Sequence, residues 1–246
     1  MKVLLAPAKK MIMDDDGIAA NALPMYLERT KVLLERLRSL SLEDLAKTWK
    51  CSDALVKVNT ERLEKMDLEG RLTPAVFAYV GLAYQHLCPG GMNDEEIAWL
   101  QKHLRILSGF YGILRPLDGT VPYRLEMQAR MPGYENLYTF WGSRLYDALE
   151  DPVIVDLASK EYSQSIVPYL KPDDRYIEIV FAEEKNGKLI TKGTMAKMAR
   201  GEMVSWMAQN GIEDPEDIKA FERGYVYSSA HSREDAFVFL RKDGRQ

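Results

Sequence analysis

The stretch of sequence that decides the fold is LRILSGFYGILRPLDGTVPYRLEM, residues 104–127. Before it, apolar residues recur at helical spacing, as between residues 24 and 40. After Arg105, Gly, Pro, Tyr and Arg alternate, and β-branched runs such as residues 153–157 follow, which indicates strands and ordered turns. Because helices gather in the N-terminal half and strands in the C-terminal half without regular βαβ alternation, we expect an α+β fold with a mixed sheet.

Composition places the chain among ordinary globular proteins. Its 246 residues suffice for a core without disulfides, and no linker or repeat divides residues 1–246, so we expect a single domain. The two cysteines, Cys51 and Cys88, have no disulfide or metal-ligand spacing, which fits a reducing cytoplasm. No apolar run is long enough for a membrane span. The net charge of −4 argues against a histone-like protein, although a local arginine cleft on an acidic body stays possible.

Capping and turn signals set the expected elements. The N-terminus has a short apolar run that Pro7 ends. We interpret this run as a buried strand and not as a signal peptide. Asn93 and Glu96 form a capping box, and Asn186-Gly187 is the strongest hairpin signal. We expect helices over residues 24–40, 42–55, 60–66, 75–87, 93–104, 138–149 and 194–210, and strands over residues 2–6, 153–157, 175–184, 188–193, 225–229 and 236–241.

Common catalytic and cofactor signatures are absent from the sequence. No GxxxxGK[ST], GxGxxG, GxSxG or HExxH motif occurs. Three histidines lie far apart: we expect His86 and His103 to be structural and His231 to lie in a polar turn. We therefore predict no metal site and no cofactor.

Residues 104–127 combine arginines, tyrosines and glycines in a way that suits phosphates and stacked bases. Gly109 and Gly112 permit close approach of the backbone to a ligand or to another strand. The alternative is a packed turn region in which the arginines pair with Asp118 and Glu126. The candidates are Arg105, Tyr111, Arg115, Tyr123 and Arg124.

Three further sites could add ligand groups. Lys9 follows the first strand, where it could hold a phosphate or act as a tuned amine, or simply belong to a solvated turn. Lys197 and Arg200 share a helix face. After the buried strand at residues 153–157, Ser159 suits an N-cap and Glu161 could be an acid or base.

Two helices flanking residues 56–60 suggest a helix-hairpin-helix, an element whose turn amides and second helix N-terminus receive a DNA phosphate. Lys57 and Asn59 stand where the turn glycines of such an element occur, and Thr60 starts the expected second helix. Asn tolerates a left-handed conformation, whereas Lys does so poorly.

Taken together, LAPAKKM, residues 104–127, LYTFWG, VIVDLASKEY, EKNGK and KMARGEM resemble, in this order, the YaaA family of bacterial peroxide-stress proteins. The resemblance covers residues 1–242. It implies a cytoplasmic protein of the hydrogen peroxide response that binds double-stranded or branched DNA through a positively charged cleft and a helix-hairpin-helix near Lys57, Asn59 and Thr60. The implied cleft contains Lys9, Arg105, Tyr111, Arg115, Tyr123, Arg124, Lys197 and Arg200.

We therefore expect a DNA-binding protein that limits oxidative damage. The alternative is an enzyme acting on DNA or a nucleobase, with Lys9, Ser159 and Glu161 as candidate catalytic residues. A role in iron handling or protein interaction is the third hypothesis, with carboxylates from residues 14–16 as conceivable iron ligands. One departure from the family is at Leu82. Family members tend to have Gly-Asp-Val-Tyr where this sequence reads Gly81-Leu82-Ala83-Tyr84.

Overall fold

Strand β1 (Lys2–Leu5) lies at the centre of the main sheet, hydrogen-bonded on both sides to parallel strands. A computed structural model of the protein describes residues 1–14 and 17–242. Val3, Leu4 and Leu5 are buried, as expected for a short apolar strand with neighbours on both sides. The main sheet has the order β11-β12-β9-β8-β1-β5-β6, with β10 paired to β9. Parallel strands form its centre and antiparallel pairs its edges, so the α+β fold with a mixed sheet is confirmed.

The remaining strands of the main sheet are β5 (Leu104–Ser108), β6 (Gly112–Leu114), β8 (Val153–Asp156), β9 (Arg175–Lys185), β10 (Lys188–Ile190), β11 (Tyr225–Tyr227) and β12 (Ala236–Arg241). Two small antiparallel pairs join β2 (Lys10–Met11) to β4 (Tyr79–Val80) and β3 (Thr73–Pro74) to β7 (Gly119–Thr120). The longer helices are α1 (Leu27–Arg38), α2 (Leu42–Trp49), α3 (Asp53–Lys65), α6 (Asp94–His103) and α10 (Gly193–Gln209). The shorter helices are α4 (Ala75–Ala78), α5 (Leu82–Leu87), α7 (Leu137–Trp141), α8 (Arg144–Asp147), α9 (Lys160–Ser163), η1 (Pro89–Gly91), η2 (Val167–Tyr169) and η3 (Pro215–Ala220).

The order of the parallel strands creates a switch point at β1. Numbered along the chain, the five parallel strands β5, β1, β8, β9 and β12 stand in the spatial order 2-1-3-4-5. The chain leaves β1 towards β5 on one side and later returns through β8 on the other side. In parallel sheets of this order, ligands bind outside the carboxyl ends of the strands at the switch point. The loops after β1 and β8 are therefore the first place to look for a site.

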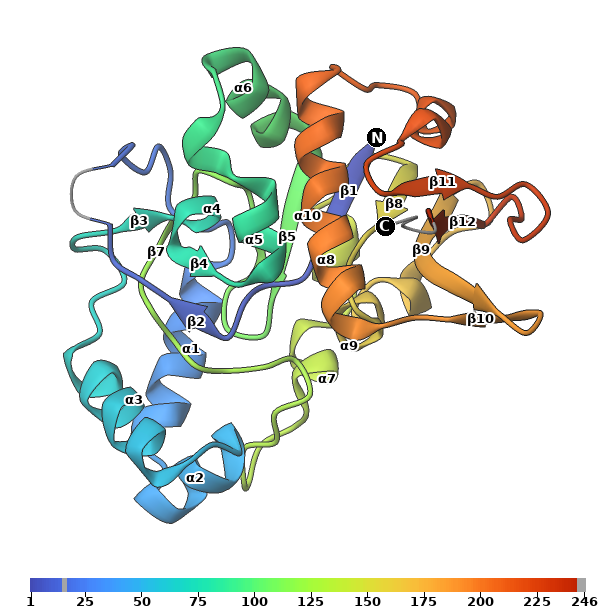
Figure 1. Cartoon of the computed structure of the whole chain (residues 1–246). Helices are drawn as coiled ribbons and strands as arrows, with labels where there is room; N and C mark the ends of the chain where they lie inside the picture. The colour runs from blue at the N-terminus through green and yellow to red at the C-terminus, as the bar shows by residue number, and fades with distance from the viewer. Residues whose placement is uncertain (15–16, 243–246) are drawn as a thin grey trace.

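Helix α10 packs along α5 in front of β1 (Figure 1). The two helices meet at Gly201, where a Cβ atom would lie only 1.9 Å from the backbone oxygen of Ala83. A hydrogen bond of 2.7 Å between His86 Nδ1 and Glu202 Oε1 joins them a turn further on, so His86 is structural, as expected. Helices α1, α2 and α3 form a separate group, at the lower left of Figure 1.

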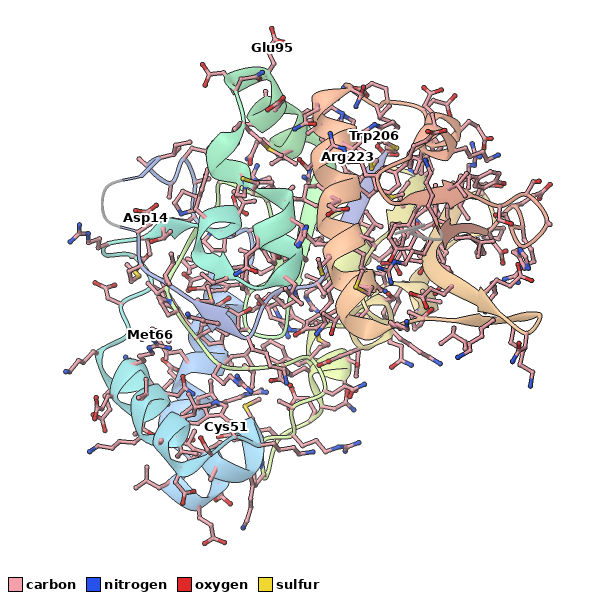
Figure 2. All side chains as sticks on the ribbon, in the orientation of Figure 1. Asp14, Cys51, Met66, Glu95, Trp206 and Arg223 are labelled. Atoms are coloured by element: carbon pink, nitrogen blue, oxygen red, sulfur yellow. The ribbon has the colours of Figure 1, made fainter. Side chains whose placement is uncertain are left out.

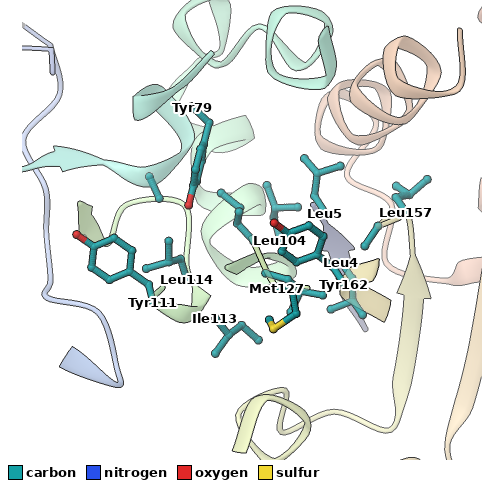
Figure 3. Packing of buried hydrophobic residues seen from close by; sticks show 14 of the residues in the cluster. Leu4, Leu5, Tyr79, Leu104, Tyr111, Ile113, Leu114, Met127, Leu157 and Tyr162 are labelled. Atoms are coloured by element: carbon teal, nitrogen blue, oxygen red, sulfur yellow. The ribbon is translucent and has the colours of Figure 1, made fainter. Parts of the chain in front are cut away.

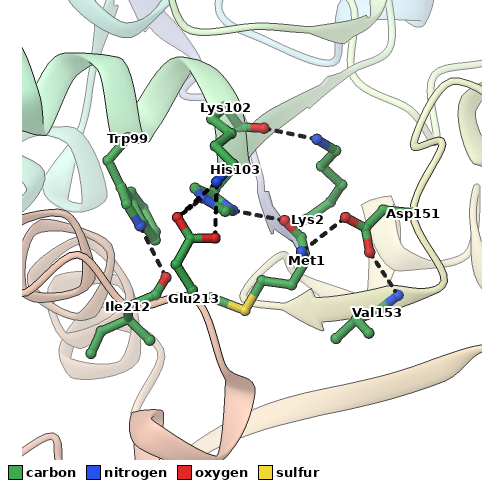
Figure 4. A network of polar contacts seen from close by, with 9 residues as sticks. All are labelled: Met1, Lys2, Trp99, Lys102, His103, Asp151, Val153, Ile212 and Glu213. Atoms are coloured by element: carbon green, nitrogen blue, oxygen red, sulfur yellow. Dashed lines mark hydrogen bonds and ion pairs between the residues drawn. The ribbon is translucent and has the colours of Figure 1, made fainter.

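The opposite end of β1 is closed by polar contacts (Figure 4). The N-terminal ammonium of Met1 lies 2.8 Å from Asp151 Oδ2, just before β8. His103, buried at the end of α6, has Nδ1 at 2.9 Å from the Met1 carbonyl oxygen and Nε2 at 3.1 Å from Glu213. Lys102 pairs with the same Glu213 at 2.8 Å. These contacts fix the amino edge of the sheet and confirm a structural role for His103.

Several elements expected from the sequence are confirmed. The capping box of Asn93 and Glu96 starts α6, and α10 ends at the expected place, with Gly211 at φ 59°. Asn186 and Gly187 both take positive φ in the turn between β9 and β10, as a two-residue hairpin of this type requires. In contrast, the single helix expected over residues 138–149 is divided at Gly142, which has φ 56°.

The continuous helix expected over residues 75–87 is wrong. Tyr79 and Val80 leave the helical conformation and pair with Lys10 and Met11 in the β2–β4 ladder. The backbone N–H of Ile12 extends this pairing by donating to the Ala78 oxygen. Tertiary pairing with a segment some seventy residues earlier thus overrides local helix preference. The break also brings the loop after β1 against the start of α5.

The hairpin turn expected at residues 56–60 is also wrong, because Lys57, Asn59 and Thr60 lie inside α3. The turn between α2 and α3 instead contains Lys50, which has φ 45°, and Cys51, labelled in Figure 2. Helical spacing continues through residues 56–60: Asn59 is buried with Val56 and Leu63 on the inner face, and the Thr60 hydroxyl donates to the Val56 oxygen at 2.9 Å. Lys50 thus adopts the left-handed conformation that ends α2, a conformation that glycine takes more readily.

Replacing Gly201 with alanine tests the contact between α5 and α10. Because the new Cβ would overlap the Ala83 backbone, we expect Gly201→Ala to lower the free energy of unfolding by about 2–4 kcal/mol. Gly193→Ala, at the first residue of the same helix, is the matched control, since its Cβ would meet nothing within 4 Å. Urea unfolding of both variants measures the difference. Equal stability of the two variants would contradict the close contact.

Candidate functional site

A pocket of about 400 Å³ lies at the switch point, outside the carboxyl ends of β1 and β8. The loop after β1, the start of α5, residues 123–126, the loop after β8 and one face of α10 form its walls. The floor is apolar and aromatic, and it includes Leu5, Leu157 and Tyr162, all labelled in Figure 3. Five cationic side chains and two carboxylates line the pocket: Lys9, Lys10, Arg124, Lys197 and Arg200, with Glu126 and Glu161. The pocket is thus locally basic on a chain of net charge −4.

A buried hydroxyl network holds residues 123–126 in place. Tyr123 Oη lies 2.7 Å from Ser108 Oγ and 2.8 Å from Tyr79 Oη, and Ser108 Oγ accepts from the backbone N–H of Tyr111. Burial raises the pKa of Tyr123 to about 12, so its hydroxyl keeps its proton at neutral pH. Gly109 lets the chain pass close by, because a Cβ there would lie 2.6 Å from the Leu125 oxygen. Gly109 therefore permits close approach of another segment of the protein, the backbone at Leu125 and Glu126.

Glu126 joins the two cations on one side of the pocket. Its Oε1 lies 3.0 Å from Lys9 Nζ and 3.0 Å from Arg124 Nη2. The Arg124 side chain is only 13% exposed, whereas that of Lys9 is 67% exposed. The pairing of Arg124 with Glu126, one of the alternatives from the sequence, is confirmed. Arg124 still lines the pocket. The single carboxylate of Glu126 is shared between Arg124 and Lys9, so this side of the pocket keeps a net positive charge.

Arg200 and Lys197 form the facing wall. Lys197 is exposed, while Arg200 is largely buried, and this burial lowers the pKa of Arg200 against the opposing effect of Asp156 and Glu178. Asp156 ends β8, where it accepts hydrogen bonds from the Ala158 N–H at 2.7 Å and from the Tyr176 hydroxyl. Burial raises the pKa of Asp156, and these hydrogen bonds and the Arg200 charge oppose that rise.

Ser159 and Glu161 reach the same pocket from the loop after β8. Ser159 occupies the N-cap position of α9, but its hydroxyl makes no capping hydrogen bond. Glu161 Oε1 accepts from the Gln128 N–H at 3.0 Å, and the Glu161 backbone oxygen accepts from Tyr138. The three candidate catalytic residues, Lys9, Ser159 and Glu161, therefore line one pocket, which is a prerequisite for a joint chemical role.

Arg105 and Arg115 lie elsewhere. Because β5 and β6 are antiparallel, the start of β5 and the end of β6 meet at the amino edge of the sheet, at the other end of β5 from the pocket. Arg115 Nε lies 3.2 Å from Asp118, whose side chain is 1% exposed and also accepts from the Arg115 N–H at 2.8 Å. Arg105 donates to the backbone oxygens of Gln101 and Leu104. These two arginines do not converge with Arg124.

Other expected candidates are placed away from the pocket or buried. Tyr111 is 1% exposed and its hydroxyl accepts from the Val121 N–H at 3.1 Å, so it is part of the core. Lys57 is exposed on α3, beside the acidic Asp53, Glu61 and Glu64. Asp15 and Asp16, proposed as iron ligands, lie outside the described residues. Within residues 1–14 and 17–242, no group of three or more His, Cys, Asp or Glu side chains could hold a metal ion.

Sequence reasoning missed the residues that the fold adds to the pocket. Tyr84, buried, donates its hydroxyl to the Ala6 oxygen at 3.0 Å and so ties α5 to the end of β1. Lys10 and Tyr162 also line the pocket, and they lie within the segments LAPAKKM and VIVDLASKEY. Asp156 does not line the pocket, but this buried carboxylate at the end of β8 acts on Arg200, and a carboxylate in such a place is a signal that the sequence offered.

A search of the described residues for membrane-spanning helices finds none of sufficient length and hydropathy.

The chain is similar to known proteins along nearly its whole length. Residues 1–231 match the model of a family described as peroxide stress protein YaaA. A "UPF0246 protein" of Agathobacter rectalis is 50% identical over 247 residues, covering 98% of this chain and 99% of its own length. Those of Pediococcus pentosaceus and Desulfitobacterium hafniense are each 46% identical, covering 99% and 98% of this chain and 99% and 98% of their own lengths.

Removing Asp118 tests whether Arg115 belongs to a structural turn. Asp118→Ala leaves the Arg115 N–H without its acceptor, and we expect it to lower the free energy of unfolding by about 1–3 kcal/mol in urea titrations. Asp235→Ala, which breaks the exposed ion pair with Arg233, is the control and should change stability little. Unchanged stability in Asp118→Ala would show that Arg115 is free for another role.

Proposed function

The chain belongs to the family of the peroxide stress protein YaaA, and we propose that it binds double-stranded or branched DNA during peroxide stress, through the basic rim of the switch-point pocket. The observation that carries this proposal is the convergence of Lys9, Arg124, Lys197 and Arg200 on one pocket. Phosphate binding needs cations that are held in place rather than scattered. Protection of DNA from oxidative damage and a cytoplasmic location form part of the same proposal.

Local charge supports DNA as the partner. On a chain of net charge −4, a cluster of five cations against two carboxylates is the local positive area that would direct the approach of a polyanion. The two arginines supply planar groups suited to phosphate oxygens, and Lys9 and Lys197 supply ammonium charges at the rim. Arg105 and Arg115 are left out, since they lie at the other edge and Arg115 is already paired.

Salt dependence and one lysine variant test this proposal. With about four phosphate contacts, the logarithm of the DNA association constant should fall with the logarithm of salt concentration with a slope of about −3 to −4. Lys197→Ala should reduce that slope by about 1 and weaken binding roughly five- to tenfold. Fluorescence anisotropy with a labelled duplex at several salt concentrations measures both quantities.

Lys102→Ala is the matched control, because Lys102 is an exposed lysine at the amino edge of the sheet (Figure 4). It should leave the affinity and the slope unchanged. Equal losses in Lys102→Ala and Lys197→Ala, or binding indifferent to salt, would overturn the proposal. DNA contact by the α2–α3 pair stays a prediction, and Lys57→Ala in the same titration tests it.

A second candidate function is chemistry on DNA or a nucleobase. The observation that favours it is that Lys9 and Glu161 line the same pocket, which provides an amine and a carboxyl group at one site. Incubation of the protein with damaged and undamaged oligonucleotides, followed by mass spectrometry, tests it. Products that disappear with both Lys9→Ala and Glu161→Gln would establish an enzyme, whereas unchanged oligonucleotides would leave binding as the function.

A further inference from the structure

The switch-point pocket is too small for a duplex and has two chemically distinct parts. Its volume of about 400 Å³ falls within the range of small-molecule sites, roughly 300–1,000 Å³. The inner wall carries Leu5, Leu157 and the rings of Tyr84 and Tyr162, whereas the cations stand around them. An apolar and aromatic floor beside a cationic rim matches a flat heterocyclic base joined to a phosphate.

Two buried donors at this pocket have no partner among the described residues. They are the Nε atoms of Arg124 and Arg200, whereas Glu126 Oε1 is held by its ion pairs with Lys9 and Arg124. Buried polar atoms are normally paired, so an unpaired donor at a cavity is open to a water, an ion or a ligand. The orphaned atoms of both arginines are the Nε–H donors. A guanidinium with a free Nε–H retains one of the paired donors used to bind a phosphate.

The place of Arg200 strengthens this point. The guanidinium is largely buried and feels the charges of Asp156 and Glu178, yet its Nε has no hydrogen-bond partner among the described residues. A buried positive charge is costly unless an anion and hydrogen bonds compensate it. A phosphate at the rim would compensate Arg200 and accept from the free Nε–H of Arg124, whose Nη2 is already paired with Glu126. This arrangement is built for an anion that enters from outside.

We propose that the pocket receives one nucleoside monophosphate unit, with its base on the apolar floor and its phosphate at Arg124 and Arg200. The unit is either a free mononucleotide or a single nucleotide turned out of a DNA strand. The second source rests on the proposed DNA-binding function. Both sources present the same chemistry, and enzymes that do chemistry on a base of DNA take that base out of the stack.

Calorimetric titrations with deoxyadenosine monophosphate, deoxyadenosine and inorganic phosphate test the pocket directly. We expect the monophosphate to bind at least tenfold more tightly than either of its parts, because only it fills both halves of the site. Arg200→Met should remove most of the advantage over deoxyadenosine. Ser159→Phe, which places a ring in the pocket without removing a cation, should abolish binding of the monophosphate. Thermal unfolding checks that both variants are folded, and Lys102→Ala should bind like the unaltered protein.

Anisotropy with two duplexes separates the sources. One duplex is fully paired, and the other carries a single unpaired deoxyadenosine. A preference of threefold or more for the unpaired base, lost in Ser159→Phe, supports a nucleotide turned out of DNA. Tight binding of the monophosphate without such a preference supports a free nucleotide. If the monophosphate binds no better than inorganic phosphate and both duplexes bind equally, the inference is overturned while DNA binding stands. If neither duplex binds, DNA binding fails and the monophosphate titration alone decides the inference.

Discussion

The parallel pairing of β1 with both β5 and β8 is the constraint on which the rest of the structure depends. Val3 is in register with Leu104 on one side and Val155 on the other, so β1 and β8 end within one residue of each other. The loops that follow β1 and β8 must then leave the sheet side by side. Lys9 and Glu161, 152 positions apart in the sequence, reach one pocket for this reason. The polar contacts around Met1 and His103 hold the other edge and leave the carboxyl edge for binding.

Local signals in the sequence predicted the parts of the fold that local interactions decide. The capping box at Asn93, the turn at Asn186-Gly187 and the extent of α10 depend on neighbours within a few residues. The break at Tyr79 could not be predicted this way, because its cause is pairing with Lys10 far along the chain. The turn between α2 and α3 was misplaced because Lys50 adopts a left-handed conformation that lysine rarely takes.

The candidate site was predicted in part, and the reason lies in the path of residues 104–127. The sequence indicated that this stretch carries arginines suited to phosphate, but spacing alone does not reveal which edge of a sheet each arginine reaches. The antiparallel turn between β5 and β6 returns Arg115 to the amino edge, where buried Asp118 pairs with it. The segment then crosses to the carboxyl edge, where Arg124 meets Lys9, Lys197 and Arg200. One stretch of sequence thus serves the core, a structural turn and the pocket.

The central claim is that phosphate is bound at the carboxyl edge of β1 and β8, by side chains that segments far apart in the chain contribute. A crystal structure of the protein with deoxyadenosine monophosphate tests it most directly. We predict the phosphate within hydrogen-bonding distance of Arg124 and Arg200, with the base against Tyr84 and Tyr162. A nucleotide bound instead beside Arg105 and Arg115 at the amino edge would contradict the account.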